Sequence, residues 1–336
     1  ELLSEVVLNL DGGGALSPAL VVEKDASGLQ RLSRAYVGDF SGNLYRLQFS
    51  NNLQPVVTKI FSIQTAKRSN PITMKPLVWK DRNDYWVYFG TGSILSKEDR
   101  GINSKELQYA IGLKDITNDM KSLDDLLKYD LEYGPELDAN VKSLSVSISS
   151  DVKGSLSNGW YIPLQIKGEE RLTGERIIST PSLTSNNDII FTTWGLNEYS
   201  NDLNAYQNDP CIADIPFSKM ISLKSRTGGH GTFKFNDQET AGIAIEGEIL
   251  GSPIGAHVTQ DTEESGEKSN SNVSYLDLGE EPPELAPNAP KDPNCINGES
   301  EIMLGTSQGG TFNAIIACQV KHQQLFRQRI SLFKVI

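Results

Sequence analysis

The sequence predicts an all-β fold made of repeated small sheets, as in a β-propeller, with one short helical insertion. Two observations carry this prediction: short β-rich runs recur on either side of Gly, Asn or Ser turns, and few segments show helical spacing. The run NLYRLQF (43–49) alternates as a strand does, with Tyr45, Leu47 and Phe49 on one face. Approximate recurrence of such strand pairs is typical of propeller blades. The runs that share the pattern are residues 35–49, 84–95, 188–200 with 219–229, and 301–320.

Composition narrows the class of protein. The chain has 336 residues, of which 38% are hydrophobic, so it can bury a core. A formal net charge of -12, without any Lys/Arg cluster, argues against a nucleic-acid partner, because phosphate binding requires a basic surface. No apolar run approaches the roughly 18 residues that cross a bilayer. Residues 1–20 begin inside strand-like sequence and lack a basic leader region, so we expect a piece of a longer protein.

Two segments interrupt the strand pattern and are interpreted as insertions. Residues 102–158 are polar and contain SLDDLLKYDLEYG, in which Ser122 can cap a helix that has two aspartates in its first turn. The leucines that follow fall at helical spacing, and a Gly-Pro pair would end the helix. Residues 259–298 are acidic and Pro-rich, which predicts a mobile or extended loop.

The segment VVEKDASGLQRLSRA (21–35) matches the first half of a calcium-binding loop. A loop of the EF-hand type uses oxygen-bearing side chains at positions 1, 3 and 5, a glycine at position 6 and a backbone carbonyl at position 7. The residues at these positions are Glu23, Asp25, Ser27, Gly28 and Leu29. Two carboxylates are few for calcium, which prefers several.

The second half of this loop departs from the pattern. Positions 9 and 12 are Arg31 and Arg34, whose charges would repel a metal ion. An insertion would be needed for Ser33 to supply an oxygen instead. The sequence therefore leaves two interpretations open: a degenerate calcium site, or a polar loop between two strands.

No catalytic centre is predicted from the other motifs. The DGGG at 11–14 lacks the Lys-Ser/Thr of a phosphate-binding loop and predicts a tight turn. The acidic pairs at 169–170 and 280–281 point apart in a strand or loop, which is typical of a solvated face. The sequence contains no G-x-S-x-G or HExxH motif. The four tryptophans stand in strand-like contexts and are predicted to be packing residues.

The cysteines allow one disulfide. A strand pair that turns near Ser307 would bring Cys295 and Cys318 roughly opposite each other, as a cross-strand bond in an oxidising compartment requires. Cys211 would then stay free or pair with chain outside this sequence. The alternative is three reduced thiols, and no CxxC or Cys/His spacing indicates zinc.

Read in order, these pieces resemble the C-terminal β-propeller of the PilC/PilY family of type IV pilus biogenesis factors and tip adhesins. The blocks that carry the resemblance are GALSPALVVEKDASG, AYVGDFSGNLYRLQF, NPITMKPLV, WVYFGTGSIL, NGWYIPL, GERIISTPSL, IIFTTW and RQRISLF. They match the later part of the family's propeller, whose blades are quinoprotein-like, which leaves an incomplete propeller as one interpretation.

The resemblance implies a non-enzymatic protein at the cell surface, at the pilus tip or outer membrane, exported through the periplasm. It would support pilus assembly, adhesion and twitching motility, with pilins, outer-membrane pilus machinery and a host or abiotic surface as partners. It also implies calcium at the loop containing Glu23, Asp25, Ser27 and Leu29, with Ser33 matching the last ligand if a gap is allowed. The alternatives are a periplasmic quinoprotein-like enzyme and a generic outer-membrane assembly scaffold.

Overall fold

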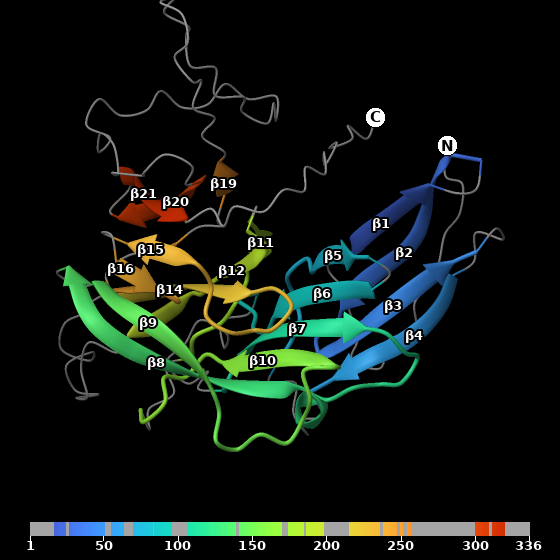
Figure 1. Ribbon diagram of the computed structural model, residues 1–336, viewed down its shortest axis with the longest axis horizontal. Coiled ribbons are helices and arrows are strands. Elements are labelled where there is room, and N and C mark those ends of the chain that lie inside the picture. The colour runs from blue at the N-terminus through green and yellow to red at the C-terminus, as the bar shows by residue number, and fades with distance from the viewer. Residues whose placement is uncertain are drawn as a thin grey trace, which may run out of the picture.

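The computed structural model is built from β-strands arranged in three sheets (Figure 1). The residues it describes are 17–24, 27–50, 55–63, 70–82, 84–95, 106–138, 141–169, 174–184, 186–197, 215–235, 238–246, 249–250, 254–256, 300–308 and 311–319. Within these ranges the one helical element is a short 3-10 turn, η1 (Leu123–Asp125). None of the described helical structure is long and apolar enough to cross a membrane.

The first sheet is an antiparallel meander of four strands in chain order, drawn in blue in Figure 1. Each strand pairs with the next through a short connection, as alternating strand patterns separated by turn residues predict. Its strands are β1 (Ala19–Lys24), β2 (Gln30–Gly38), β3 (Asn43–Phe49) and β4 (Pro55–Ser62).

The turn between β2 and β3 is closed by the Asp39 side chain. Its Oδ1 accepts hydrogen bonds from the backbone N–H groups of Ser41 (2.8 Å) and Asn43 (2.9 Å). Its Oδ2 accepts from Asn43 Nδ2 (2.7 Å) and from the Tyr45 hydroxyl (3.1 Å). Gly42 has φ +77°, in the left-handed region that favours glycine. The sequence GDFSGN thus forms a turn that its own Asp, Gly and Asn residues specify.

The central sheet has 11 strands, in the order β11-β12-β14-β17-β9-β8-β10-β7-β6-β5, with β13 paired to β14. It consists of two sets that we call the near half (β5, β6, β7 and β10) and the far half (the remaining strands). The halves are joined by a short parallel contact between β10 and β8, in which Trp160 pairs with Leu127 and Tyr161 with Lys128. The other pairings are antiparallel, and the near half has the four strands of a propeller blade.

The near half contains β5 (Leu77–Asp81), β6 (Asp84–Gly90), β7 (Tyr109–Asp115) and β10 (Gly159–Pro163). The far half contains β8 (Leu127–Asp138), β9 (Val141–Ile148), β11 (Ser182–Leu183), β12 (Asp188–Thr192), β13 (Gly195–Asn197), β14 (Ile215–Lys224) and β17 (Gly242–Glu246). The third sheet has the order β16-β15-β21-β20-β18, with β19 paired to β20. Its strands are β15 (Phe233–Phe235), β16 (Gln238–Thr240), β18 (Ile249–Leu250), β19 (Ile254–Ala256), β20 (Ser300–Gln308) and β21 (Thr311–Gln319).

The predicted helical insertion at 102–158 is wrong, because this segment supplies strands β7, β8 and β9. The predicted helix start at Ser122 is confirmed, but the helix is a single 3-10 turn. There the Asp125 carboxylate accepts hydrogen bonds from the Ser122 N–H (2.8 Å) and hydroxyl (2.9 Å). From Leu127 onward, apolar residues alternate with charged ones, and the alternate side chains Tyr129 and Leu131 are buried. This period of two outweighs the helical spacing of the leucines, since it places one face against the core.

The last strand pair, β20–β21, was predicted in the correct place, but it turns later than expected. Gln308 pairs with Thr311, and the register sets Cys318 opposite Glu301. Cys295 and Cys211 lie outside the described residues, as does the predicted acidic loop at 259–298. The disulfide between Cys295 and Cys318 therefore stays a prediction.

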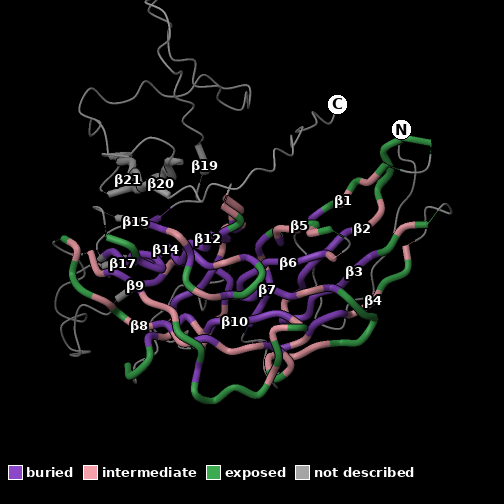
Figure 2. Tube along the Cα trace, viewed as in Figure 1, coloured by how far each residue is buried: buried purple, intermediate pink, exposed green. Residues whose placement is uncertain are grey.

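Sheet faces pack on one another to form the core (Figure 2). Tyr36 and Phe61 of the first sheet meet Val87 and Phe89 of β6, and the rings of Phe61 and Phe89 are in edge contact at 5.4 Å. The near half packs in turn on the far half through Trp160, Tyr88 and Phe191, and the far half packs on Phe233 of the third sheet. Figure 2 shows buried residues concentrated where these faces meet, and exposed residues at the outer ends of β1, β2 and β8. This face-to-face succession is the packing of propeller blades.

The closeness of β7 to the Trp160 ring can be tested by adding one methyl group. A Cβ at Gly112 would lie 2.5 Å from the Trp160 ring, so Gly112→Ala must displace a fully buried indole. We expect this overpacking to lower the free energy of unfolding by about 1–3 kcal/mol, measured by urea denaturation.

Gly229→Ala is the matched control, because the nearest atom to its added Cβ is 3.7 Å away. It is expected to change the free energy of unfolding by less than about 0.5 kcal/mol. Equal effects of the two substitutions would contradict the tight packing of β7 on Trp160.

Candidate functional site

The residues predicted as calcium ligands lie on the hairpin formed by β1 and β2. Glu23 is near the end of β1 and pairs directly across the hairpin with Arg31 of β2. Ser27 and Leu29 are exposed in the connection between the strands, and Asp25 lies outside the described residues. The hairpin register shifts at Val21, next to Ser33, so the segment is an irregular β-hairpin.

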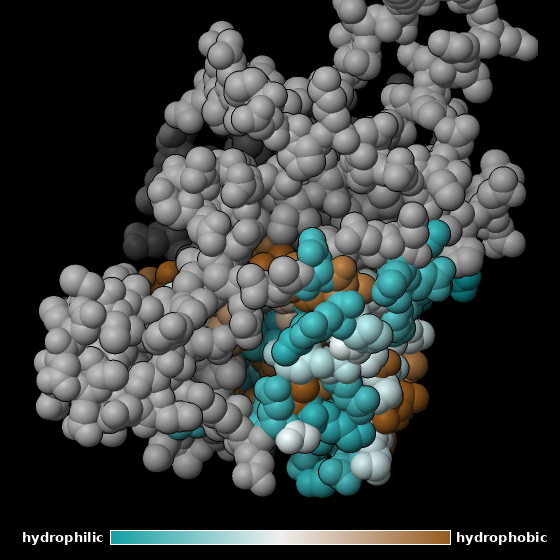
Figure 3. Space-filling view, turned by 90° about the vertical axis from the view of Figure 1, so that its left-hand side faces the viewer, coloured by the Kyte–Doolittle hydropathy of each residue, from teal (hydrophilic) through white to brown (hydrophobic). Residues whose placement is uncertain are grey.

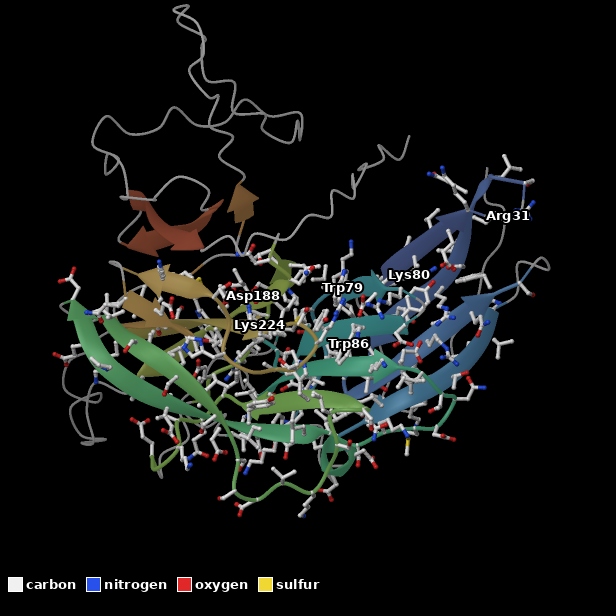
Figure 4. All side chains as sticks on the ribbon, in the orientation of Figure 1. Arg31, Trp79, Lys80, Trp86, Asp188 and Lys224 are labelled. Atoms are coloured by element: carbon white, nitrogen blue, oxygen red, sulfur yellow. The ribbon has the colours of Figure 1, made fainter. Side chains whose placement is uncertain are left out.

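Glu23 points from the hairpin to the near half of the central sheet. Its Oε1 accepts hydrogen bonds from the Lys80 ammonium group and the Tyr85 hydroxyl, which are cross-strand neighbours on β5 and β6. The Lys80 ammonium, followed by the Tyr85 hydroxyl, lowers the pKa of Glu23 to about 2, so its charge is retained at neutral pH. Figure 4 shows Arg31 toward the outer end of the hairpin and Lys80 nearer the middle of the molecule.

Ser33, the predicted ligand on β2, already makes a hydrogen bond within the first sheet. The Ser33 hydroxyl donates to the carbonyl oxygen of Val21 at 3.2 Å. Its neighbour Arg34 lies with its guanidinium carbon 4.1 Å from the centre of the Tyr85 ring and donates from Nη1 to Asp115 Oδ2 at 3.3 Å. Contacts therefore run without interruption from Glu23 through Tyr85 to Arg34 and on to β7.

Asp115, the last residue of β7, ends this chain of contacts in the interior. Its carboxylate is buried and accepts from Arg46 Nη1 at 2.6 Å and from the Tyr36 hydroxyl at 2.7 Å, in addition to Arg34. Arg46 also donates from Nη2 to Asn118. Burial, reinforced by the charge of Asp115, raises the pKa of the Tyr36 hydroxyl, which stays protonated and can act as the donor.

We call this set of contacts the junction seam, because it joins the first sheet to the near half of the central sheet. Its members are Glu23, Arg34, Tyr36 and Arg46 from the first sheet, and Lys80, Tyr85 and Asp115 from the near half. Three cations and two carboxylates alternate along it. A buried charge is costly unless it is paired and hydrogen-bonded, so the buried end of the seam, Asp115 with Arg46, requires both sheets to be in place.

The described residues of the hairpin do not fit a calcium site. Glu23 is the one predicted carboxylate among them, and its side chain is held by a lysine and a tyrosine. Calcium takes six to eight oxygen ligands, several of them carboxylates. Within the part of the chain that the structure describes, no group of three or more His, Cys, Asp or Glu side chains could hold a metal ion.

Sequence reasoning missed Lys80, Tyr85 and Asp115, which complete the seam. They stand in WKDRNDY and YAIGLKD, where no motif marks them and where their partners are more than 50 residues away. A charged residue at the end of an apolar strand, as Asp115 is, was the available signal for a buried ion pair. Of the two arginines that argued against metal binding in the sequence, Arg34 is a member of the seam.

A second buried ion pair ties the far half to the segment GERIISTPSL. Lys219 of β14 lies with Nζ 2.5 Å from Glu175 Oε2 and also donates to the carbonyl oxygen of Leu164 at 3.0 Å. The Thr193 hydroxyl donates to the other oxygen of Glu175. The neighbouring Arg176 donates from Nη1 to the carbonyl oxygen of Ser93 at 2.6 Å. Each of these charged side chains therefore has a hydrogen-bonding partner within the structure.

Asp188 ties the segment before β15 to the far half. Its Oδ2 accepts from the backbone N–H (2.7 Å) and hydroxyl (2.6 Å) of Thr232, and Lys224 Nζ lies 2.9 Å from Oδ1. Asp188 is fully buried, and Figure 4 shows it close to Lys224 in the far half. The carboxylate thereby fastens the chain that enters the third sheet.

The chain is similar to proteins of type IV pili. Over 147 residues, 43% of this chain, it is 31% identical to the type IV pilus biogenesis factor PilY1 homolog of Xylella fastidiosa, and the match covers 11% of that protein. The crystal structure of the Pseudomonas aeruginosa PilY1 C-terminal domain matches with a TM-score of 0.54 and 18% identity, covering 74% of this chain and 58% of that chain. No protein-family model matches.

These similarities confirm the resemblance to the PilC/PilY family that the sequence blocks predicted. The all-β propeller fold class is confirmed as well, apart from the helical insertion. The chain spans about a tenth of the length of the curated relative.

The contribution of the junction seam to the free energy of unfolding can be measured by replacing Asp115. Asp115→Ala leaves Arg34 and Arg46 without their shared carboxylate, and Arg46 is buried. Breaking a buried pair in this way is expected to cost about 3–5 kcal/mol of unfolding free energy, measured by urea denaturation.

The matched control is Asp124→Ala, which removes an exposed carboxylate 3.5 Å from Lys153. Exposed pairs contribute about 0–1 kcal/mol, so this variant should resemble the wild type. A similar loss of stability in both variants would show that Asp115 has no special role.

Proposed function

We propose that this chain is the propeller part of a non-enzymatic type IV pilus protein that supports pilus assembly, surface adhesion and twitching motility. The observation that carries the proposal is the 31% identity to a pilus biogenesis factor over 147 residues. The fold likeness to the PilY1 C-terminal domain is consistent with it. Because the relative is much longer than this chain, the activity of the whole protein is part of the proposal.

The proposed mechanism is display: a rigid scaffold of sheets holds the connecting segments in position to contact partners. Buried charges such as Asp115, Glu175 and Asp188 are engaged in fastening one sheet or segment to another. A scaffold of this kind positions its connecting segments for recognition, and loops are where binding residues usually lie. The acidic, Pro-rich composition of residues 259–298 suits a contact segment.

The surface is compatible with contacts in an aqueous compartment. On the side that Figure 3 shows, the described residues form a mainly hydrophilic surface with smaller hydrophobic areas at its margin. The partners we propose are pilins, the outer-membrane pilus machinery and a host or abiotic surface. The location we propose is the pilus tip or outer membrane, reached by export through the periplasm.

Deleting the gene tests this function. A deletion strain should lose surface pili, twitching and adherence, measured by electron microscopy, twitching-zone diameter and attachment counts, and the wild-type gene should restore all three. Restoration by Asp124→Ala but not by Asp115→Ala would link the loss to the propeller scaffold. Normal piliation, twitching and adherence in the deletion strain would overturn the proposal.

A further inference from the structure

We propose that the Lys80 ammonium group takes the place of a metal ion at the β1–β2 hairpin, so that this hairpin is held in position independently of calcium. This fastening of the first sheet does not depend on the proposed function. Glu23 stands at the first ligand position of the calcium-loop pattern, and its carboxylate contacts the Lys80 ammonium group.

Lys80 connects two hairpins through its contact with Glu23. It lies on β5, whereas Glu23 lies on β1, so their contact links two hairpins that are separated by more than 50 residues. Tyr85, the cross-strand partner of Lys80, donates to the same carboxylate oxygen. One oxygen therefore accepts hydrogen bonds from both strands of the β5–β6 hairpin, which fastens the β1–β2 hairpin to the near half of the central sheet.

Glu23 is surrounded by cationic side chains. Arg31 is its cross-strand neighbour, Lys80 contacts its carboxylate, and Arg34 lies on the ring of Tyr85. A divalent ion at Glu23 would approach a carboxylate already neutralised by the Lys80 ammonium, and would be repelled by these cations. The local charge is what would be expected where a cation is already built into the chain.

The neighbouring side-chain oxygen on β2, that of Ser33, already makes a hydrogen bond within the first sheet. The Ser33 hydroxyl, which could match the last ligand of the loop, donates to the carbonyl oxygen of Val21. Binding a metal through Ser33 would require this contact and the irregular register beside it to rearrange. The oxygens of Glu23 and Ser33 thus already have hydrogen-bonding partners within the protein.

A calcium titration and a double-mutant cycle together test this proposal. For the purified wild-type protein, we expect the same thermal unfolding midpoint, within about 1 °C, in EDTA and in millimolar calcium, the range in which weak extracellular calcium modules bind. Isothermal titration calorimetry should show no binding heat. A calcium-dependent rise of the midpoint that disappears in Glu23→Gln would overturn the proposal.

The cycle uses Glu23→Gln, Lys80→Met and the double variant, all in EDTA. The single substitutions should not be additive, with a coupling of about two- to fivefold in the unfolding equilibrium constant, as measured for partly exposed ion pairs. Asp124→Asn and Lys153→Met form the control cycle at a more exposed pair and should show little coupling. Additive effects at Glu23 and Lys80 would overturn the proposal.

Lys80→Arg is a control that separates loss of the positive charge from general disruption of folding. It keeps the charge and should retain more stability than Lys80→Met if the cation is what matters. If Lys80→Arg and Lys80→Met were equally destabilised while the wild type gained stability from calcium, the role of Lys80 as the built-in cation would be refuted.

Discussion

The hydrogen-bonded contact between Asp115 and two arginines is the interaction on which the packing of the first sheet depends. Asp115 ends a strand of the central sheet, while Arg34 and Arg46 come from adjacent strands of the first sheet. Burying a carboxylate and an arginine is favourable only when each finds its partner at hydrogen-bonding distance. Apolar packing between Phe61 and Phe89 tolerates small shifts, whereas this pairing fixes where one sheet lies on the next.

The same solution recurs at the other boundaries of the fold. Lys219 and Glu175 tie a connecting segment to the far half, and Asp188 holds the chain that enters the third sheet. Between these points, aromatic and aliphatic side chains pack together around Trp160. The ion pairs of the described interior thus hold neighbouring sheets and segments together. A scaffold that displays its loops requires this kind of rigid core.

The sequence was informative where structure is local and misleading where it is not. The turn around Asp39 and the alternation of β3 follow from neighbouring residues, so both were predicted. The segment after Ser122 satisfied a helix start and a leucine spacing, but pairing with β9 and β10 turned it into a strand. No local pattern could connect Glu23 to Lys80, because contact between β1 and β5 exists only in the folded protein.

Hydrogen–deuterium exchange over β2 and β3 gives the most direct test of the claim that ion pairs, rather than a metal, hold the first sheet in place. We expect equal, slow exchange of the buried amides from Ala35 to Gly38 in EDTA and in calcium. We also expect faster exchange throughout the first sheet, but not in β12 and β14, when Arg46 is replaced by methionine. Protection that exists only in calcium, or that is unaffected by Arg46→Met, would contradict it.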